Sequence, residues 1–133
     1  MLNFFLFFAG VCPNTLQKSK YASCIEVIGA CVFCEYAIIF VDVKDDQNID
    51  ENKIEEKITK RTKAIMPVHL TGRMCAMDKI MKISKKYKIP VIEDCAQSIL
   101  SKYKNKMSGT WGDVGCFSAH PLKNLNAMGD SGY

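Results

Sequence analysis

A single lysine, Lys123, lies in the segment FSAHPLKNLNAMGDSG, among proline, glycine and small polar residues that predict loop and turn. An acidic pair, Glu93 and Asp94, ends the apolar run IPVIED. A lysine amine can form a Schiff base with an aldehyde cofactor, and a buried carboxylate can keep a pyridine nitrogen protonated. Ser118, five residues before Lys123, offers a hydroxyl to a phosphate group. Together these residue types are the minimum that pyridoxal phosphate chemistry requires.

Each of these residues also has a plainer interpretation. Lys123 alone is more typical of a solvated surface lysine, and Asp94 could equally cap a helix or turn that follows it. His69, at the end of the run PVHL, is more often structural when it stands alone. The glycines and small residues of NLNAMGDSG would let the backbone approach a ligand closely. The cofactor hypothesis therefore depends on these residues acting together.

Strand-like and helix-like signals alternate from about Ala37 onward. The runs AIIFVDV, KAIMPVHL and IPVIED are short and apolar, which is typical of buried strands. Between them, NIDENKIEEKITK predicts a helix with Asp50 as its N-cap, and MDKIMKISKKYK predicts a second helix. One face of the second helix, opposite its lysines, carries Met77, Ile80, Met81, Ser84 and Tyr87. The alternation predicts a mostly parallel sheet with helices on both faces.

Sheets of this kind bind ligands beyond the C-terminal ends of their strands. The residues at these predicted ends are Asp42, His69 with Thr71, and Glu93 with Asp94. We therefore expect an α/β fold, as a three-layer α/β/α domain in which Asp94, His69 and Lys123 converge on one crevice.

The composition narrows the classes of partner. The 133 residues are 48% hydrophobic and 24% charged, which is typical of one globular domain. The net charge of +4 is modest, and its lysines are scattered over predicted helices, so we expect no nucleic-acid partner. The opening MLNFFLFFAG lacks a preceding basic residue and is too short to span a membrane as a helix, so we expect no membrane partner. It is a buried strand or helix, or an N-terminus disturbed by truncation.

Seven cysteines are spread along the chain, which has two histidines. Cys31 and Cys34 form a CxxC pair inside an apolar run, without a second such pair. This pattern favours buried thiols over a metal or redox site, and we expect no metal. An odd number of scattered cysteines fits a reducing cytoplasm best.

Four segments carry a more specific signal. FVDVKDDQNID, TKAIMPVHLTG, IPVIEDCAQS and GDVGCFSAHPLKNLNAMGDSG resemble, in order and spacing, the DegT/DnrJ/StrS family. These proteins are fold-type I, pyridoxal-phosphate-dependent sugar aminotransferases of the aspartate aminotransferase superfamily. The resemblance covers residues 37–132. It implies that residues 37–133 are part of the large cofactor-binding domain, and that residues 1–36 are a poorly matched N-terminal segment.

The resemblance also implies roles for particular residues. Lys123 corresponds to the Schiff-base lysine, whose freed amine moves a proton between the substrate carbon and the cofactor. Asp94 pairs with the pyridine nitrogen, and Gln97 lies beside the ring near its 3-hydroxyl. Ser118 matches the family's phosphate-binding serine.

The substrate side of the site also has candidate residues. The candidates are His120 and Asn124, which flank the lysine, and His69. The implied reaction passes an amino group from glutamate or glutamine to a nucleotide-linked keto sugar, in a homodimer when the protein is full length.

Two alternatives remain open. Some relatives are sugar dehydratases that use the same cofactor, but they lack this lysine. The other alternative is a truncated, catalytically silent fragment. The family's N-terminal Gly-Thr phosphate contact and C-terminal domain are not recognisable here, and Ser131 stands where the family's turn usually has glycine. We therefore expect the central part of a larger enzyme.

Overall fold

A computed structural model of the chain describes residues 3–8 and 36–133. The Cys31–Cys34 pair lies outside the described residues. The main sheet consists of β1 (Asn3–Phe8), β2 (Tyr36–Ile39), β3 (Thr62–Pro67), β4 (Ile92–Asp94) and β7 (Val114–Cys116). A separate antiparallel hairpin is formed by β5 (Lys102–Tyr103) and β6 (Lys106–Met107).

Every pairing within the main sheet is parallel. β1 pairs with β2 on one side and with β3 on the other. Two parallel bridges, Ile65 to Val91 and Val68 to Asp94, continue the sheet from β3 to β4, which pairs in turn with β7. The order is therefore β2-β1-β3-β4-β7, and the predicted parallel sheet is confirmed. The opening segment forms the strand β1, which is one of the alternatives that we considered.

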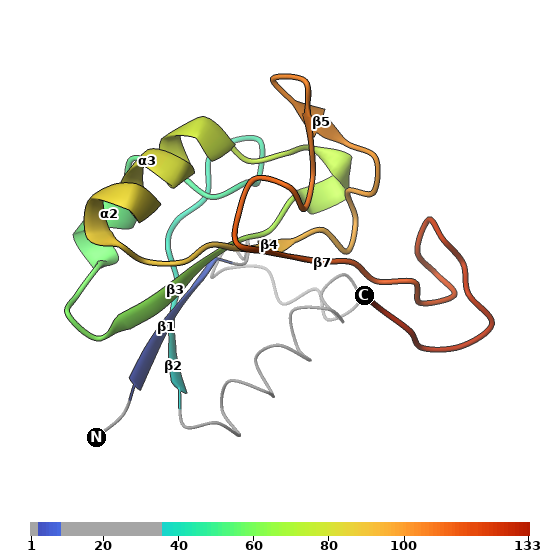
Figure 1. The fold of residues 1–133 in the computed structure, drawn as a ribbon, viewed down its shortest axis with the longest axis horizontal. Helices are drawn as coiled ribbons and strands as arrows, with labels where there is room; N and C mark the ends of the chain where they lie inside the picture. The colour runs from blue at the N-terminus through green and yellow to red at the C-terminus, as the bar shows by residue number, and fades with distance from the viewer. Residues whose placement is uncertain (1–2, 9–35) are drawn as a thin grey trace.

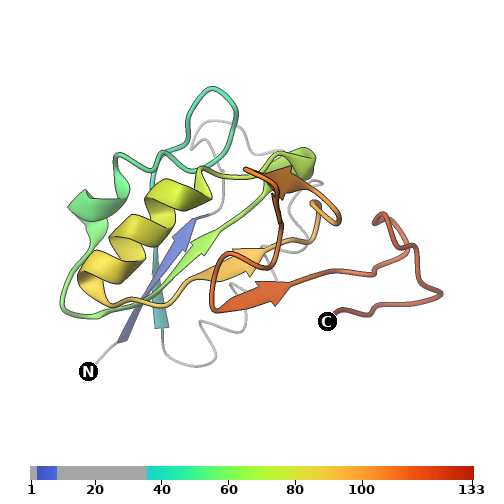
Figure 2. The same cartoon turned by 45° about the horizontal axis from the view of Figure 1, so that its top comes forward.

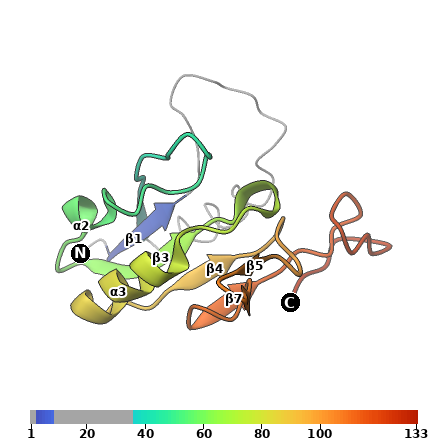
Figure 3. The same ribbon diagram turned by 90° about the horizontal axis from the view of Figure 1, so that it is seen from above.

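Two helices, α2 (Ile54–Lys57) and α3 (Met77–Tyr87), lie over the same face of the sheet (Figures 1 and 3). The core between helices and sheet contains Ile54, Ile65, Ile80 and Val91, none of which is exposed to solvent. No helix among the described residues covers the opposite face, where we also expected one. No helix in the described part of the chain is long and apolar enough to cross a membrane.

The helix α3 follows its predicted pattern closely. Met77, Ile80 and Ser84 are buried as predicted, and Met81 is partly buried. Ile83 is also buried, because it lies one turn from Ile80 on the edge of the same face. Among the predicted core positions Tyr87 differs, since it is exposed at the end of the helix, where its hydroxyl donates to Glu55 Oε2 (2.7 Å).

The region before α3 departs from our expectations. The run AIIFVDV is a strand only to Ile39, and Val43 then forms an antiparallel bridge with Ile49 that closes a polar turn. We predicted Asp50 as the N-cap of α2, and this was wrong, because the N-cap of α2 is Lys53. Asp50 Oδ1 accepts instead from the backbone N–H of Asn52 (3.0 Å), as aspartate commonly does within turns, and the helix begins later. Asp42, which we expected at the crevice, is exposed and pairs with Lys53 (2.8 Å).

The segment after β7 forms a long loop that continues beyond the C-terminal end of that strand (Figure 2). Phe117 and Tyr133 exchange two backbone hydrogen bonds (2.7 and 3.0 Å), which join the ends of the loop. Farther out, the Ala119 N–H donates to Ser131 O (2.8 Å) and the Ala127 N–H donates to Ala119 O (2.9 Å). The residues between 119 and 127, with Lys123 among them, form the tip.

Two glycines allow the strand β7 to lie against the preceding turn. A Cβ atom on Gly115 would lie 2.5 Å from the Cα of Gly109, which is a backbone atom that cannot rotate away. We therefore expect Gly115→Ala to destabilise the protein by about 1–3 kcal/mol, the usual cost of overpacking. Gly129→Ala is the matched control, because a Cβ there meets nothing within 4 Å. Urea unfolding of both variants tests this, and equal midpoints would contradict it.

Candidate active site

The carboxylate of Glu93 is the most highly hydrogen-bonded group at the C-terminal end of β4. It is fully buried, and its Oε1 accepts from the backbone N–H groups of Trp111 and Gly112 (both 2.7 Å). Its Oε2 accepts from the Gly109 N–H and from His69 Nε2 (both 3.0 Å). Glu93 therefore ties the end of β3 and the turn before β7 to β4.

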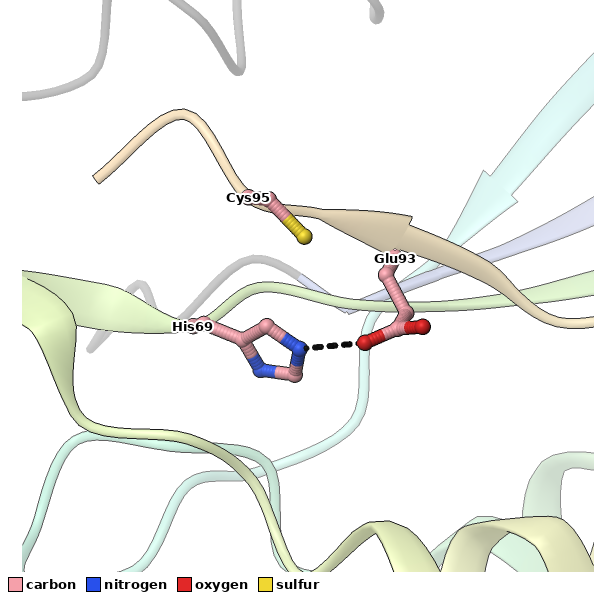
Figure 4. A group of neighbouring side chains, drawn as sticks. All are labelled: His69, Glu93 and Cys95. Carbon is pink, nitrogen blue, oxygen red and sulfur yellow. Dashed lines mark hydrogen bonds and ion pairs between the residues drawn. The ribbon is translucent and has the colours of Figure 1, made fainter. Parts of the chain in front are cut away.

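His69 follows β3 and contacts this carboxylate from a fully buried position. Its Nδ1 accepts from the Cys75 N–H (3.2 Å), so this nitrogen carries no proton. The proton must then be on Nε2, which donates to Glu93 (Figure 4). Both ring nitrogens of the neutral imidazole are thus used within the protein, and contact between His69 and a substrate stays a prediction.

Cys95 completes a cluster with His69 and Glu93, in which one ligand atom from each residue lies within 4.8 Å of the others (Figure 4). Such a group could hold a metal ion. Burial, however, raises the pKa of the Cys95 thiol to about 12, and the Glu93 carboxylate already accepts four hydrogen bonds. The contacts fit a hydrogen-bonded support better than a metal centre.

Asp94 points to the other side of the strand, because successive side chains alternate between the two faces. Its Oδ1 accepts from the Ala96 N–H (3.0 Å). Its Oδ2 is buried and has no hydrogen-bond partner among the described residues. A buried oxygen of this kind is costly unless a ligand group donates to it.

Two other predicted residues lie near Asp94. Burial raises the pKa of the Asp94 carboxyl above its usual value. The Ala96 N–H opposes this rise, and so does the positive charge of Lys123. Lys123 therefore lies within electrostatic reach of the buried carboxylate. His69 lies beside Asp94 because its backbone N–H donates to Asp94 O (3.1 Å), at the end of the sheet where ligands bind.

Gln97 lies in the turn just after β4. Its Oε1 accepts from the backbone N–H of Thr71 (3.0 Å). Thr71 is the middle residue of the short helical turn η1 (Leu70–Gly72) and has a left-handed backbone conformation with φ 53°. No hydrogen bond to the Gln97 amide nitrogen occurs within the described part of the chain. The contact with Thr71 orients the amide and leaves its N–H₂ as the free donor.

The loop after β7 places the remaining predicted residues near one another in sequence and space. Ser118 Oγ accepts from the His120 N–H (3.3 Å). The Lys123 N–H donates to His120 O (2.8 Å), and Lys123 O accepts from the Asn126 N–H (3.0 Å). Lys123 is half-buried and Asn124 is exposed. The lysine is thus held in a hydrogen-bonded turn.

Asn48 is a supporting residue that no pattern in the sequence indicates. Its side chain is buried, with Nδ2 donating to Arg73 O (3.0 Å) and Oδ1 accepting from the Leu70 N–H (3.2 Å). It therefore fixes both ends of η1, the turn that contacts Gln97. An asparagine in a polar loop is typical of an exposed turn, so only the fold reveals its role.

Comparison with known proteins agrees with the geometry of the site. The model of the DegT/DnrJ/EryC1/StrS aminotransferase family matches residues 21–133. This chain belongs to that family. The match begins earlier than the segments at 37–132 that carry the resemblance in the sequence.

Among curated relatives of this family, the chain is 48% identical over 95 residues to a UDP-N-acetyl-3-dehydro-alpha-D-glucosamine 3-aminotransferase from Acidithiobacillus ferrooxidans, covering 71% of this chain and 26% of that protein. It is 58% identical over 71 residues to a dTDP-3-amino-3,6-dideoxy-alpha-D-galactopyranose transaminase from Aneurinibacillus thermoaerophilus. This match covers 53% of this chain and 20% of that protein. The chain spans about a quarter of the length of the curated relatives that it matches.

Solved structures of the family share the fold. A family aminotransferase from Brucella abortus superposes with a TM-score of 0.82 at 31% identity, covering 98% of this chain and 34% of that one. NtdA from Bacillus subtilis, solved with the bound cofactor PMP, superposes with a TM-score of 0.77 at 32% identity. This superposition covers 98% of this chain and 26% of that one. The fold is therefore the α/β fold of fold-type I aminotransferases, as the sequence predicts.

Proposed function

We propose that the intact protein is a pyridoxal-phosphate-dependent aminotransferase that passes an amino group from glutamate or glutamine to a nucleotide-linked keto sugar. One observation carries this proposal: the buried Asp94 Oδ2, which lacks a partner among the described residues, lies within electrostatic reach of the Lys123 amine. The names of the relatives, which are nucleotide-sugar aminotransferases, support the substrate class.

The residues present fit pyridoxal phosphate. The pyridine N–H would satisfy Asp94 Oδ2, and the positive charge of that ring would keep the carboxylate ionised despite its burial. The free amide N–H₂ of Gln97 would face the ring's 3-hydroxyl. Ser118, which holds one backbone N–H in the lysine loop, would donate its hydroxyl proton to the phosphate.

The chemistry divides between the cofactor and the chain. When bound, pyridoxal phosphate supplies an aldehyde carbon that condenses with amines and a ring that accepts electron density from the substrate carbon. Lys123 Nζ would hold the cofactor at its aldehyde carbon. The free Lys123 amine would take a proton from the substrate carbon and return it, as base and then as acid. Asp94 would keep the ring nitrogen protonated.

The neighbouring substrate and subunit contacts are part of the same proposal. Asn124, exposed beside Lys123, stays a candidate for the substrate side. Leu122 and Met128, both highly exposed in the lysine loop, would be covered by the second subunit of a homodimer. Because Cys75, Cys95 and Cys116 are free thiols, we place the reaction in the reducing cytoplasm.

The two alternatives are less well supported. A dehydratase of this family would lack the lysine, and this chain has Lys123 within reach of Asp94. A silent fragment would have no reason to retain a buried carboxylate oxygen that lacks a partner in the described part of the chain, since such a group costs stability without a ligand.

Visible absorption of the intact protein with pyridoxal phosphate tests the proposal. Adding glutamate or glutamine without a sugar acceptor should convert the absorbance of the aldehyde form into that of the aminated form. Asp94→Asn should still bind some cofactor but should slow this half-reaction by about 10²-fold or more, because an amide does not hold the ring nitrogen protonated. The exposed Asp45→Asn is the matched control. An unchanged spectrum with both donors, or a normal rate in Asp94→Asn, would contradict the proposal.

A further inference from the structure

The tip of the lysine loop lacks the packing that usually fixes a catalytic side chain. Leu122 is 88% exposed and Leu125 is 45% exposed, and Asn124 is exposed as well. The backbone hydrogen bonds between the two limbs of the loop end at Ala119 and Ala127. Within this chain, the position of Lys123 in the tip therefore depends on hydrogen bonds made inside the loop.

His120 is the residue that makes contacts on every side of this turn. Its Nδ1 accepts from the Leu122 N–H (3.0 Å), so Nε2 carries the proton. Nε2 lies 3.2 Å from Asp130 Oδ1 on the returning limb. The backbone of His120 donates its N–H to Ser118 Oγ (3.3 Å) and accepts the Lys123 N–H at its carbonyl (2.8 Å).

We infer that His120 is a positioning residue that fixes the Lys123 turn, and that its imidazole does not act on the substrate. This inference rests on the proposed function. One ring nitrogen accepts the Leu122 N–H, the other lies against Asp130 in the same loop, and the same residue joins the proposed phosphate contact at Ser118 to the lysine. A displacement of about 1 Å at a reacting group can cost about 10²-fold in rate, so an arrangement that fixes this turn has a direct effect on the chemistry.

The two ring contacts are unequal, which makes the inference testable. The bond from the Leu122 N–H to the side chain two residues earlier has the pattern of an Asx turn, which asparagine forms with its own Oδ1. The contact with Asp130 joins two side chains that are 41% and 83% exposed, and such surface pairs contribute little. The contact to Leu122 should therefore carry most of the effect.

The experiment uses the intact protein with pyridoxal phosphate and follows the rate at which the cofactor's visible band forms on Lys123. We expect His120→Leu to lower this rate by about 10²-fold. His120→Asn, which restores the acceptor for the Leu122 N–H, should return close to the wild-type rate. His120→Gln, whose longer side chain can reach Asp130 but is not suited to the Asx-type bond, should behave like His120→Leu. Asp130→Asn should resemble the wild type.

A second measurement does not depend on the cofactor. In ¹⁵N NMR of the histidine side chains without cofactor, the neutral form of the His120 ring should carry its proton on Nε2 and none on Nδ1. A neutral ring with its proton on Nδ1, a normal rate in His120→Leu, or equal losses in the Leu and Asn variants would overturn the inference. If the wild type forms no band at Lys123 while the NMR tautomer is as expected, the proposed function fails and the structural role of His120 stands.

Discussion

Replacing Lys123 with arginine should abolish amino transfer as completely as replacing it with alanine. Arginine keeps the positive charge near Asp94, but its guanidinium cannot form the covalent bond to the cofactor's aldehyde carbon or shuttle a proton at neutral pH. Proton transfer by a positioned side chain alone contributes about 10²–10⁴-fold, so each variant should lose at least that factor in turnover.

Steady-state assays with a keto-sugar nucleotide measure this loss directly. Lys85→Arg is the matched control, since that lysine is exposed on α3 and should tolerate the change. Near-normal turnover in Lys123→Arg would make the lysine an electrostatic contact only, and the aminotransferase mechanism would then be wrong.

Replacing Glu93 with glutamine should give the largest loss of stability in this domain. The amide would present an N–H₂ group to donors that now meet a carboxylate oxygen, among them His69 Nε2 and the Gly109 N–H. Breaking buried, charge-assisted contacts of this kind typically costs about 3 kcal/mol or more in the free energy of unfolding. Glu56→Gln, on the exposed side of α2, is the control. Chemical unfolding with equal midpoints for both variants would contradict this role.

Glu93→Gln should also change how the stability of the protein depends on pH. Burial raises the pKa of the Glu93 carboxyl, but hydrogen bonds from His69, Gly112 and Gly109 outweigh it and hold the pKa below the ordinary 4.5. A carboxylate with a lowered pKa stabilises the fold above its unfolded pKa, and this contribution is lost as the pH falls through the folded value. The stability difference between wild type and Glu93→Gln should therefore shrink below about pH 4.5. Glu51, whose pKa is lowered to about 2, is present in both proteins and cancels.

The sequence predicted the parts of the fold that depend on local patterns. The parallel sheet and α3 follow from apolar runs and from helical spacing, which act within a few residues. The place of β1 between β2 and β3 could not be predicted in this way, because strand order depends on contacts between distant segments. The length of α2 was overestimated, since Asp50 bonds within a turn instead of capping the helix.

The sequence likewise predicted only some features of the candidate site. Lys123, Asp94 and Ser118 could be selected because their side chains have distinctive chemistry at recognisable spacing. Glu93 and His120 were also selected, but their supporting roles could not be predicted. Glu93 collects backbone N–H groups from the turn before β7, and His120 accepts one from Leu122. Every residue except proline has such a group, so the sequence carries no signal of where they point.

The central claim, that Lys123 and Asp94 belong to one cofactor site, is tested most directly by reducing the intact protein with borohydride in the presence of pyridoxal phosphate. Borohydride converts the carbon–nitrogen double bond into a stable single bond, and mass spectrometry of a digest locates the modified lysine. We expect the added mass on the peptide that contains Lys123, and none in Lys123→Arg. Modification of a different lysine, or no adduct at saturating cofactor, would contradict it.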